Sequence, residues 1–196
     1  MNDNDTGTER TEKGRTIRYN LGTFEGFNLR SQSAIPRNLT AAEVVAWEHD
    51  REGEAEFWPA GDRPEVLILF RSRSSITATD LIELDRLLGE LGSDAVENLL
   101  RVHYAVNVSG TDLSLLTREA VEDNCLEIFL GTTFTDLRRE AAYQLFELFY
   151  PEEYRAWEKT TCDGLIFDTN RFLDSPAFAI EEIQLGDQVA LLVASQ

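Results

Sequence analysis

The run Val-Leu-Ile-Leu-Phe at residues 66–70 constrains the fold more than any other stretch of this chain. It has no polar side that could face water, so it predicts a strand buried on both faces of a sheet. A sheet buried in this way needs helices packed against it. We therefore expect an α/β or α+β fold with a mixed central β-sheet, helices packed on it and a C-terminal antiparallel hairpin.

Helical and extended patterns alternate along the rest of the chain. Thr40 with Glu43 forms the sequence pattern of a capping box, Thr77 or Thr79 caps the helix that follows residues 66–70, and Pro151 starts another helix after a long one. The expected helices cover residues 41–47, 79–91, 94–100, 111–123 and 135–150, with a short one after Pro151. The expected strands cover residues 16–21, 66–70, 102–108, 125–130, 164–168, 177–183 and 188–194. Residues 22–38 and 58–64 are expected to be irregular.

The first 15 residues are polar apart from Met1, which predicts a disordered N-terminal arm. Residues 16–196 are long enough for a single globular domain, and the hydrophobic content of the whole chain, 42%, is enough for a core. No run approaches the ~20 apolar residues of a membrane span. The chain starts without the apolar core of a secretory signal, and Cys125 and Cys162 form no closely spaced pair. We therefore expect reduced thiols in a cytoplasmic protein.

Charge is the most distinctive bulk property. Asp and Glu number 36 against 18 Lys and Arg, which gives a formal net charge of −18. Such a chain is repelled by phosphate backbones and by anionic membranes, so direct nucleic-acid or membrane binding is disfavoured and a basic protein partner is favoured. Solubility and adaptation to high salt are alternative explanations of the acidity. A GC-rich genome would explain why only Lys13 and Lys159 among the cations are lysines, but not the excess of carboxylates.

Motifs that would identify a catalytic or cofactor site are missing from the sequence. His49 beside Asp50 lacks the further ligands of a metal site, and Cys162 has only Lys159 as a nearby cation. His103 falls on the polar phase of the expected strand at residues 102–108. The Asp168–Asp174 stretch lacks the glycine and the distal glutamate of a calcium loop. We expect no cofactor and no metal, and an enzyme that uses paired carboxylates stays open as an alternative.

The carboxylates cluster on the expected helices, where i, i+3 and i+4 neighbours stand ~5–6 Å apart. Holding like charges so close costs folding energy, which suggests that they serve a contact. The candidate partner-binding residues are Glu48, Asp50, Glu52, Glu54, Glu56, Asp80, Glu83, Asp85, Glu90, Asp94, Glu97, Glu152 and Glu153.

These clusters predict an acidic protein-binding module, and its narrowest form is an inhibitor or a nucleic-acid-mimicking decoy for a basic partner. A second hypothesis is an accessory subunit of a larger assembly, bound through aromatic surface. The aromatic residues that could serve as its anchors are Trp47, Trp58, Tyr150, Tyr154 and Trp157. The sequence gives no indication of the oligomeric state.

Overall fold

The computed structural model describes residues 15–28, 37–49, 55–59, 76–92, 95–110, 112–123, 126–160 and 167–195. The chain forms two compact units, residues 1–116 and 117–196. The predicted strand at 66–70 and almost all of the predicted N-terminal arm lie outside the described residues. The single domain expected over 16–196 stays a prediction.

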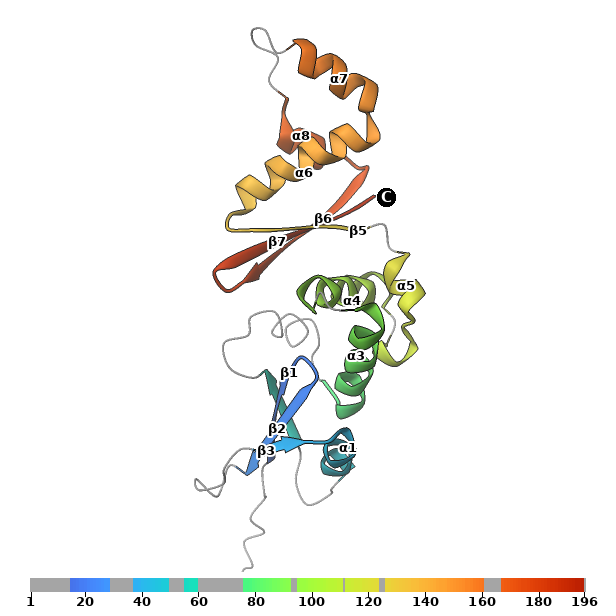
Figure 1. Ribbon diagram of the computed structural model, residues 1–196, viewed down its shortest axis with the longest axis vertical. Helices are drawn as coiled ribbons and strands as arrows, with labels where there is room; N and C mark the ends of the chain where they lie inside the picture. Colours follow the sequence, from blue (N-terminus) through green and yellow to red (C-terminus); the bar gives the residue numbers. More distant parts are fainter. Residues whose placement is uncertain are drawn as a thin grey trace, which may run out of the picture. The chain divides into compact units, whose positions relative to one another are not determined.

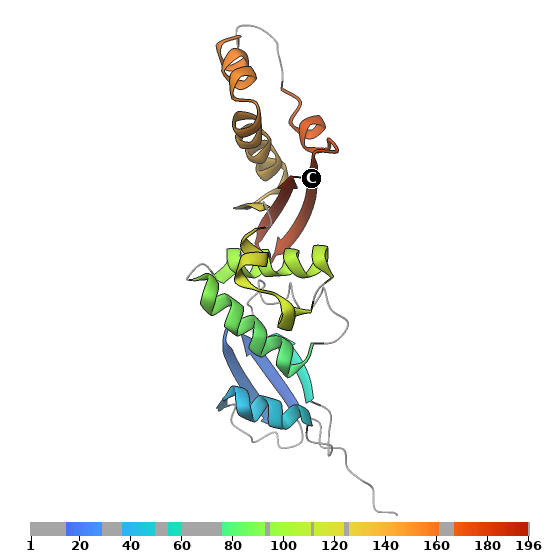
Figure 2. The ribbon, with the colours of Figure 1, turned by 90° about the vertical axis from the view of Figure 1, so that its right-hand side faces the viewer.

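The first unit contains a mixed sheet with strand order β3-β2-β1-β4 (Figure 1). Its strands are β1 (Arg15–Asn20), β2 (Thr23–Asn28), β3 (Arg37–Leu39) and β4 (Ala55–Pro59). β1 pairs antiparallel with β2 and parallel with β4. The helices of the unit are α1 (Ala41–His49), α3 (Ala78–Leu91), α4 (Ala95–Ser109) and the 3₁₀ turn η1 (Leu113–Leu115). Figures 1 and 2 show α1 and α3 on the same side of this sheet.

A buried hydrogen bond connects α3 to β1. Tyr19 is fully buried, and its Oη donates to Asp85 Oδ1 at 2.7 Å. Asp85 also accepts a hydrogen bond from the backbone N–H of Gly22. Gly22 and Leu21 form the tight β1–β2 turn, and both have positive φ, 88° and 38°, as the favoured two-residue hairpin turn requires. One carboxylate of α3 therefore fixes the end of β1 and the turn that follows it.

The second unit is built on an antiparallel sheet with strand order β5-β7-β6. Its strands are β5 (Leu126–Gly131), β6 (Phe178–Leu185) and β7 (Gln188–Ser195). Its helices are α5 (Arg118–Glu122), α6 (Phe134–Phe149), α7 (Pro151–Thr160) and α8 (Thr169–Leu173). The β6–β7 hairpin confirms the predicted C-terminal hairpin. With the mixed sheet of the first unit, it also confirms the predicted fold class.

The core of the second unit forms between α6 and the sheet. Leu137, Ala141 and Leu145 form a buried stripe on α6, which packs against the β7 residues Val189, Leu191 and Val193. Gly131 ends β5 two residues before the helix cap Thr133. A Cβ atom at Gly131 would lie 2.8 Å from a methyl carbon of Leu137, so glycine allows the close approach of β5 to α6.

The clearest error of the sequence analysis is the strand predicted at 102–108. These residues belong to α4, and the buried residues Leu99, Val102 and Ala105 recur at helical spacing. Both periods fit this stretch, because Val102, Tyr104, Val106 and Val108 alternate while Leu99, Val102 and Val106 follow the helical repeat. His103, predicted on the polar side of a strand, is buried in the helix instead.

Smaller corrections concern element boundaries. Residues 22–38, predicted irregular, contain β2 and β3, and the predicted 58–64 loop overlaps the end of β4. The helix predicted over 111–123 is η1 followed by α5, whose cap is Thr117. The strand predicted at 164–168 lies mostly outside the described residues, but Asp168 caps α8. No helix of the described residues is both long and apolar enough to span a bilayer.

We expect Gly131→Ala to lower the free energy of unfolding by about 1–3 kcal/mol, because the new methyl group would overlap Leu137, which is itself buried. Chemical denaturation measures the effect. The matched control is Gly89→Ala on the exposed side of α3, where an added Cβ meets no atom within 4 Å. That change should raise the free energy of unfolding by about 0.5–1 kcal/mol through helix propensity. Equal effects of the two changes would contradict the close β5–α6 approach.

Tyr19→Phe tests the bond between α3 and β1. Burial raises the pKa of Asp85 above 3.8, and the hydrogen bonds from Tyr19 and Gly22 oppose that rise. A raised folded-state pKa makes stability fall as pH rises through it. Losing the Tyr19 bond should therefore raise the pKa of Asp85 further and destabilise the fold by about 1.5–3 kcal/mol near pH 7, and by less below about pH 4. Denaturation at both pH values measures this difference, and a pH-independent loss would contradict it.

Candidate functional site

Several carboxylates that the sequence analysis proposed as partner-binding residues bond within their own unit. The Oε1 atom of Glu48 accepts the backbone N–H of Ala78 at 2.9 Å, at the start of α3. Asp80 completes the capping box of the same helix by accepting the N–H of Thr77 at 2.9 Å. Asp85 is bonded to Tyr19 and Gly22, as described above. These three carboxylates thus contribute to the folding of the first unit.

Others form ion pairs with an arginine of their own helix, on α3 and on α4. Arg86 pairs with Glu83 at 2.8 Å and with Glu90 at 2.7 Å, and Arg101 lies 3.7 Å from Glu97. Exposed pairs of this kind contribute little to stability, but they partly neutralise the carboxylates.

The remaining candidates fall into two groups. Asp50, Glu52, Glu54 and Asp94 lie outside the described residues, as does the side chain of Glu56 on β4. Glu152 and Glu153 are exposed in the first turn of α7, where the positive end of the helix dipole stabilises them. The partner-binding role of all thirteen candidates stays a prediction.

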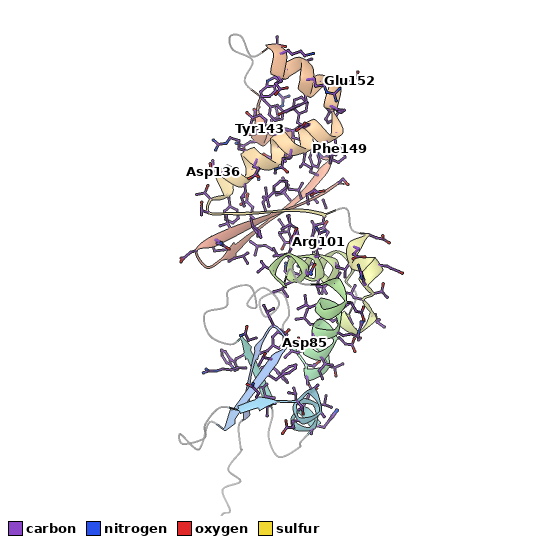
Figure 3. All side chains as sticks on the ribbon, in the orientation of Figure 1. Asp85, Arg101, Asp136, Tyr143, Phe149 and Glu152 are labelled. Atoms are coloured by element: carbon purple, nitrogen blue, oxygen red, sulfur yellow. The ribbon has the colours of Figure 1, made fainter. Side chains whose placement is uncertain are left out.

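The second unit contains an open groove of about 860 Å³ between β5, α6 and α7, named here the β5–α6–α7 groove. It is lined by Glu127, Phe129, Gln144, Leu145, Glu147, Leu148, Pro151, Tyr154, Arg155 and Glu158. Figure 3 labels Tyr143 and Phe149 on α6 and Glu152 at the start of α7, the two helices that form its walls.

The local sequence explains how these three elements come together. Thr133 caps α6 by accepting the N–H of Asp136 at 3.2 Å, so the helix starts directly after β5 and runs back along it. α6 ends at Phe149, and Pro151 begins α7 after the single linking residue Tyr150. The chain turn at Tyr150 and Pro151 brings Glu158 of α7 to the same groove as Glu147 of α6.

A cluster of aromatic rings joins α7 to α6. Phe146 of α6 stacks on Phe167 with ring centroids 4.7 Å apart, and Trp157 of α7 contacts Tyr143 at 5.6 Å and Phe146 at 6.4 Å. Trp157, one of the predicted interface anchors, therefore packs inside its own unit. Tyr154 takes part as well, at 5.7 Å from Phe146, while its ring also lines the groove.

The groove is electronegative. Glu127, Glu147 and Glu158 come from β5, α6 and α7, and Arg155 is the one cation among the residues that line the groove. Partial burial raises the pKa of Tyr154, and the negative charges of Glu147 and Glu158 raise it further. Both carboxylates therefore act on the same point of the groove, where a cationic group would be stabilised.

Apolar surface adjoins these charges. Phe129, Leu145 and Pro151 line the groove together with Leu148, which is 62% exposed. The next two residues of the chain are also well exposed, Phe149 at 48% and Tyr150 at 46%. Three consecutive apolar or amphipathic side chains in contact with water form an unusual local patch, since large apolar residues are normally buried.

The other candidate groups have structural roles or no site around them. His49 is exposed, and the Nε2 atom of His103 lies 3.0 Å from the Nδ2 atom of Asn107. Asp174 forms an ion pair with Arg138, which also binds Glu182 of β6 at 3.1 Å. Within the described ranges, no three His, Cys, Asp or Glu side chains are grouped so that they could hold a metal ion. Cys125 and Cys162 lie outside those ranges.

A second, shallower hollow of about 480 Å³ lies beside α8, where Phe146, Tyr150, Phe172 and Phe178 contribute to its walls. Its charged residues are Asp168 and Arg171. Asp168 accepts the backbone N–H of Arg171 at 3.0 Å as the cap of α8, so its carboxylate is already engaged. The larger groove is therefore the better candidate site.

The sequence predicted Glu152 and Glu153 as partner-binding residues. It did not predict that Glu127, Glu147 and Glu158 would lie around one groove. Glu127 is a lone charge on an apolar strand, and it meets the other two only through the packing of α6 on β5. One signal was present in the sequence: a long helix followed at once by Pro151 predicts two helices joined by a sharp turn, with side chains near the turn facing each other.

Replacing Glu147 and Glu158 by Gln together should lower the pKa of Tyr154 toward its ordinary value, because the negative charges that oppose tyrosinate formation are removed. The absorbance of tyrosinate, compared with that of a Tyr154→Phe variant, measures the change. Glu119→Gln with Asp187→Asn is the matched control, since both side chains are exposed and neither lines the groove. An equal shift in the control would show that total charge, and not the groove, sets this pKa.

Comparison with known proteins adds no family to this description. The chain matches no protein-family model, no curated protein and no solved structure. The function proposed below therefore rests on the residues of the β5–α6–α7 groove.

Proposed function

We propose that this chain is a protein-binding module for a basic partner, and that the partner binds in the β5–α6–α7 groove. The observation that supports it most is the convergence of Glu127, Glu147 and Glu158 from three separate elements on one open groove. Complementary charge speeds association and selects the partner surface. The formal net charge of −18 adds long-range attraction for a basic protein and repulsion for a nucleic acid.

The apolar part of the groove supplies the affinity that exposed charges do not. Leu148 and Pro151, which are both exposed and line the groove, offer surface whose burial contributes about 25 cal/mol per Å². Interfaces gain most of their energy from a few buried apolar or aromatic anchors, surrounded by polar groups that give specificity. We infer that the partner presents cationic side chains next to apolar ones, so that both kinds of surface are matched.

The nucleic-acid-mimicking decoy is the narrower form of this proposal. It needs carboxylates that are free to act at phosphate-like spacing on a helix face. The carboxylates of α3 fit this less well, because Asp80 and Asp85 are bonded to backbone and to Tyr19, and Arg86 lies between Glu83 and Glu90. A groove binder therefore fits the described residues better than a decoy. We expect the encounter to take place in the cytoplasm, since two cysteines in 196 residues are typical of a reducing compartment.

A second candidate function is an accessory subunit of a larger assembly, bound through apolar surface. The exposure of Leu148, Phe149 and Tyr150 at the end of α6 favours it. The two candidates differ in their response to salt, because screening weakens exposed charge pairs and leaves apolar contacts in place.

The test of the groove binder is affinity capture from a lysate of the native cells with three immobilised proteins. These are the wild type, a groove variant with Glu127→Gln, Glu147→Gln and Glu158→Gln, and a control variant with Glu119→Gln, Asp123→Asn and Asp187→Asn. The two variants lose the same charge, but the control residues lie outside the groove. We expect basic proteins to bind the wild type and the control at low salt and to be released as the salt concentration rises. The groove variant should not capture these proteins.

Equal capture by the groove variant and the control would contradict the proposal. Binding that persists at high salt and is lost on Leu148→Ser with Phe149→Ser would support the accessory subunit instead.

A further inference from the structure

Two of the three walls of the β5–α6–α7 groove are helix faces. The residues of α7 that line the groove stand at positions i, i+3, i+4 and i+7, so they share one face over two turns: Pro151, Tyr154, Arg155 and Glu158. None of the residues Pro151–Thr160 of α7 is buried, so this face keeps its access to water. At 1.5 Å per residue, it offers a surface about 10 Å long.

These walls can hold an occupant through side chains more readily than through backbone groups. The backbone groups inside α6 and α7 are bonded within their own helices. On the third wall, Leu126 of β5 has a bonding partner of its own, so the outer edge of β5 is not open along its length. An extended segment shielded by the walls would leave N–H and C=O groups unpaired, which lowers the affinity. A helix brings its backbone bonds with it.

Charged and apolar surface lie side by side in the groove. Glu127 and Glu147 are exposed carboxylates, and Leu148 and Pro151 are exposed apolar residues. Glu147 and Leu148 are consecutive on α6, so both kinds of surface occur within one helical turn. An amphipathic helix with cationic residues beside its apolar stripe presents the complementary arrangement.

We infer that the groove takes one amphipathic α-helix of the basic partner, with lysine or arginine facing Glu127 and Glu147 and apolar side chains packed on Leu148 and Pro151. This inference rests on the proposed function and specifies how the partner is held. The face of α7 is long enough for two turns of that helix, which direct the side chains at i, i+3, i+4 and i+7 into the groove.

Arg155 makes the site more selective. Its exposed side chain lines the groove one turn along α7 from Pro151. A helix with cations on every flank would bring one of them beside Arg155, and like charges opposed in an interface reduce the affinity. The preferred helix is therefore cationic on one flank, and apolar or acidic on the flank next to Arg155.

A second copy of this chain is opposed by its charge. Each copy carries a formal net charge of −18, so two copies repel each other at low salt, while a basic helix is attracted. Sedimentation of the full-length protein at low and at high salt tests this occupant. A dimer that Leu148→Ser abolishes would assign the groove to a second copy and would overturn the inference.

The test of the helix uses a synthetic peptide of about four turns, in which lysine and leucine follow the helical repeat, with the full-length protein. Two further peptides serve as controls. In one, the same residues are rearranged so that lysine and leucine alternate, which suits an extended chain. In the other, proline replaces a central leucine and breaks the helix. Calorimetry measures the affinity, and circular dichroism measures the helix content of the bound peptide.

We expect the peptide with the helical repeat to bind at low salt, to gain helix content, and to bind about tenfold more tightly than either control peptide. The double variant Glu127→Gln with Glu147→Gln should bind it about tenfold more weakly than the wild type. Glu119→Gln with Asp187→Asn removes the same charge from exposed positions outside the groove and should change the affinity little.

Arg155→Gln should strengthen the binding of this peptide about threefold, because the cation inside the groove is removed. Arg118→Gln is its matched control, since it removes the same charge from an exposed position on α5. An equal gain in the two variants would contradict the place of Arg155 in the binding site.

Equal affinity of the three peptides would overturn the helical mode of binding. An equal loss in the two double variants would show that total charge, and not the groove, selects the peptide, and would overturn the site. If the peptide with the helical repeat does not bind, the inference is wrong, while lysate capture judges the proposed function separately.

Discussion

A chain with 36 carboxylates and 18 cationic side chains folds against the mutual repulsion of its negative charges, and hydrogen-bond donors placed beside carboxylates reduce that cost. The helix starts provide them. Glu43, Asp80 and Asp136 stand three residues after Thr40, Thr77 and Thr133, and in all three cases the acid and the threonine are hydrogen-bonded at the start of their helix. Each pairing places a negative charge where the helix dipole is positive. Part of the acidity that first suggested a binding surface thus belongs to the architecture of the helices.

The groove carboxylates differ from these structural ones. Glu127, Glu147 and Glu158 line an open groove between three elements, whereas the carboxylates of the helix caps lie at the starts of their helices. Burial raises the pKa of Tyr154, and the negative charges of Glu147 and Glu158 raise it further, so both carboxylates act on one side chain of the groove. Clustering along the sequence did not separate the two kinds of carboxylate, whereas their positions in the structure, at helix starts or around the groove, do.

The sequence predicted those features that depend on neighbouring residues. Thr40 with Glu43, Pro151 after a long helix and the apolar runs on either side of Gly186 are local signals, and the helices and the hairpin they predict are present. Residues 102–108 were mistaken for a strand because their β-branched alternation outweighed a helical repeat that begins at Leu99, outside that window. The groove was not predictable in the same way. It depends on the distance between β5 and α6, which is set by a contact between Gly131 and Leu137, and on the direction of α7.

The cluster of aromatic rings around Phe146 affects the entropy cost of binding a partner in the groove. Phe146 contacts Tyr154 and Trp157 of α7 as well as Phe167 and Phe172, so both helical walls share one rigid centre before any partner arrives. A receptor organised in advance loses little conformational entropy on association, and most of the ordering cost falls on the partner. The affinity of a partner can then be tuned by its own stiffness while the receptor stays unchanged, and a partner that is already ordered in its bound conformation binds more tightly.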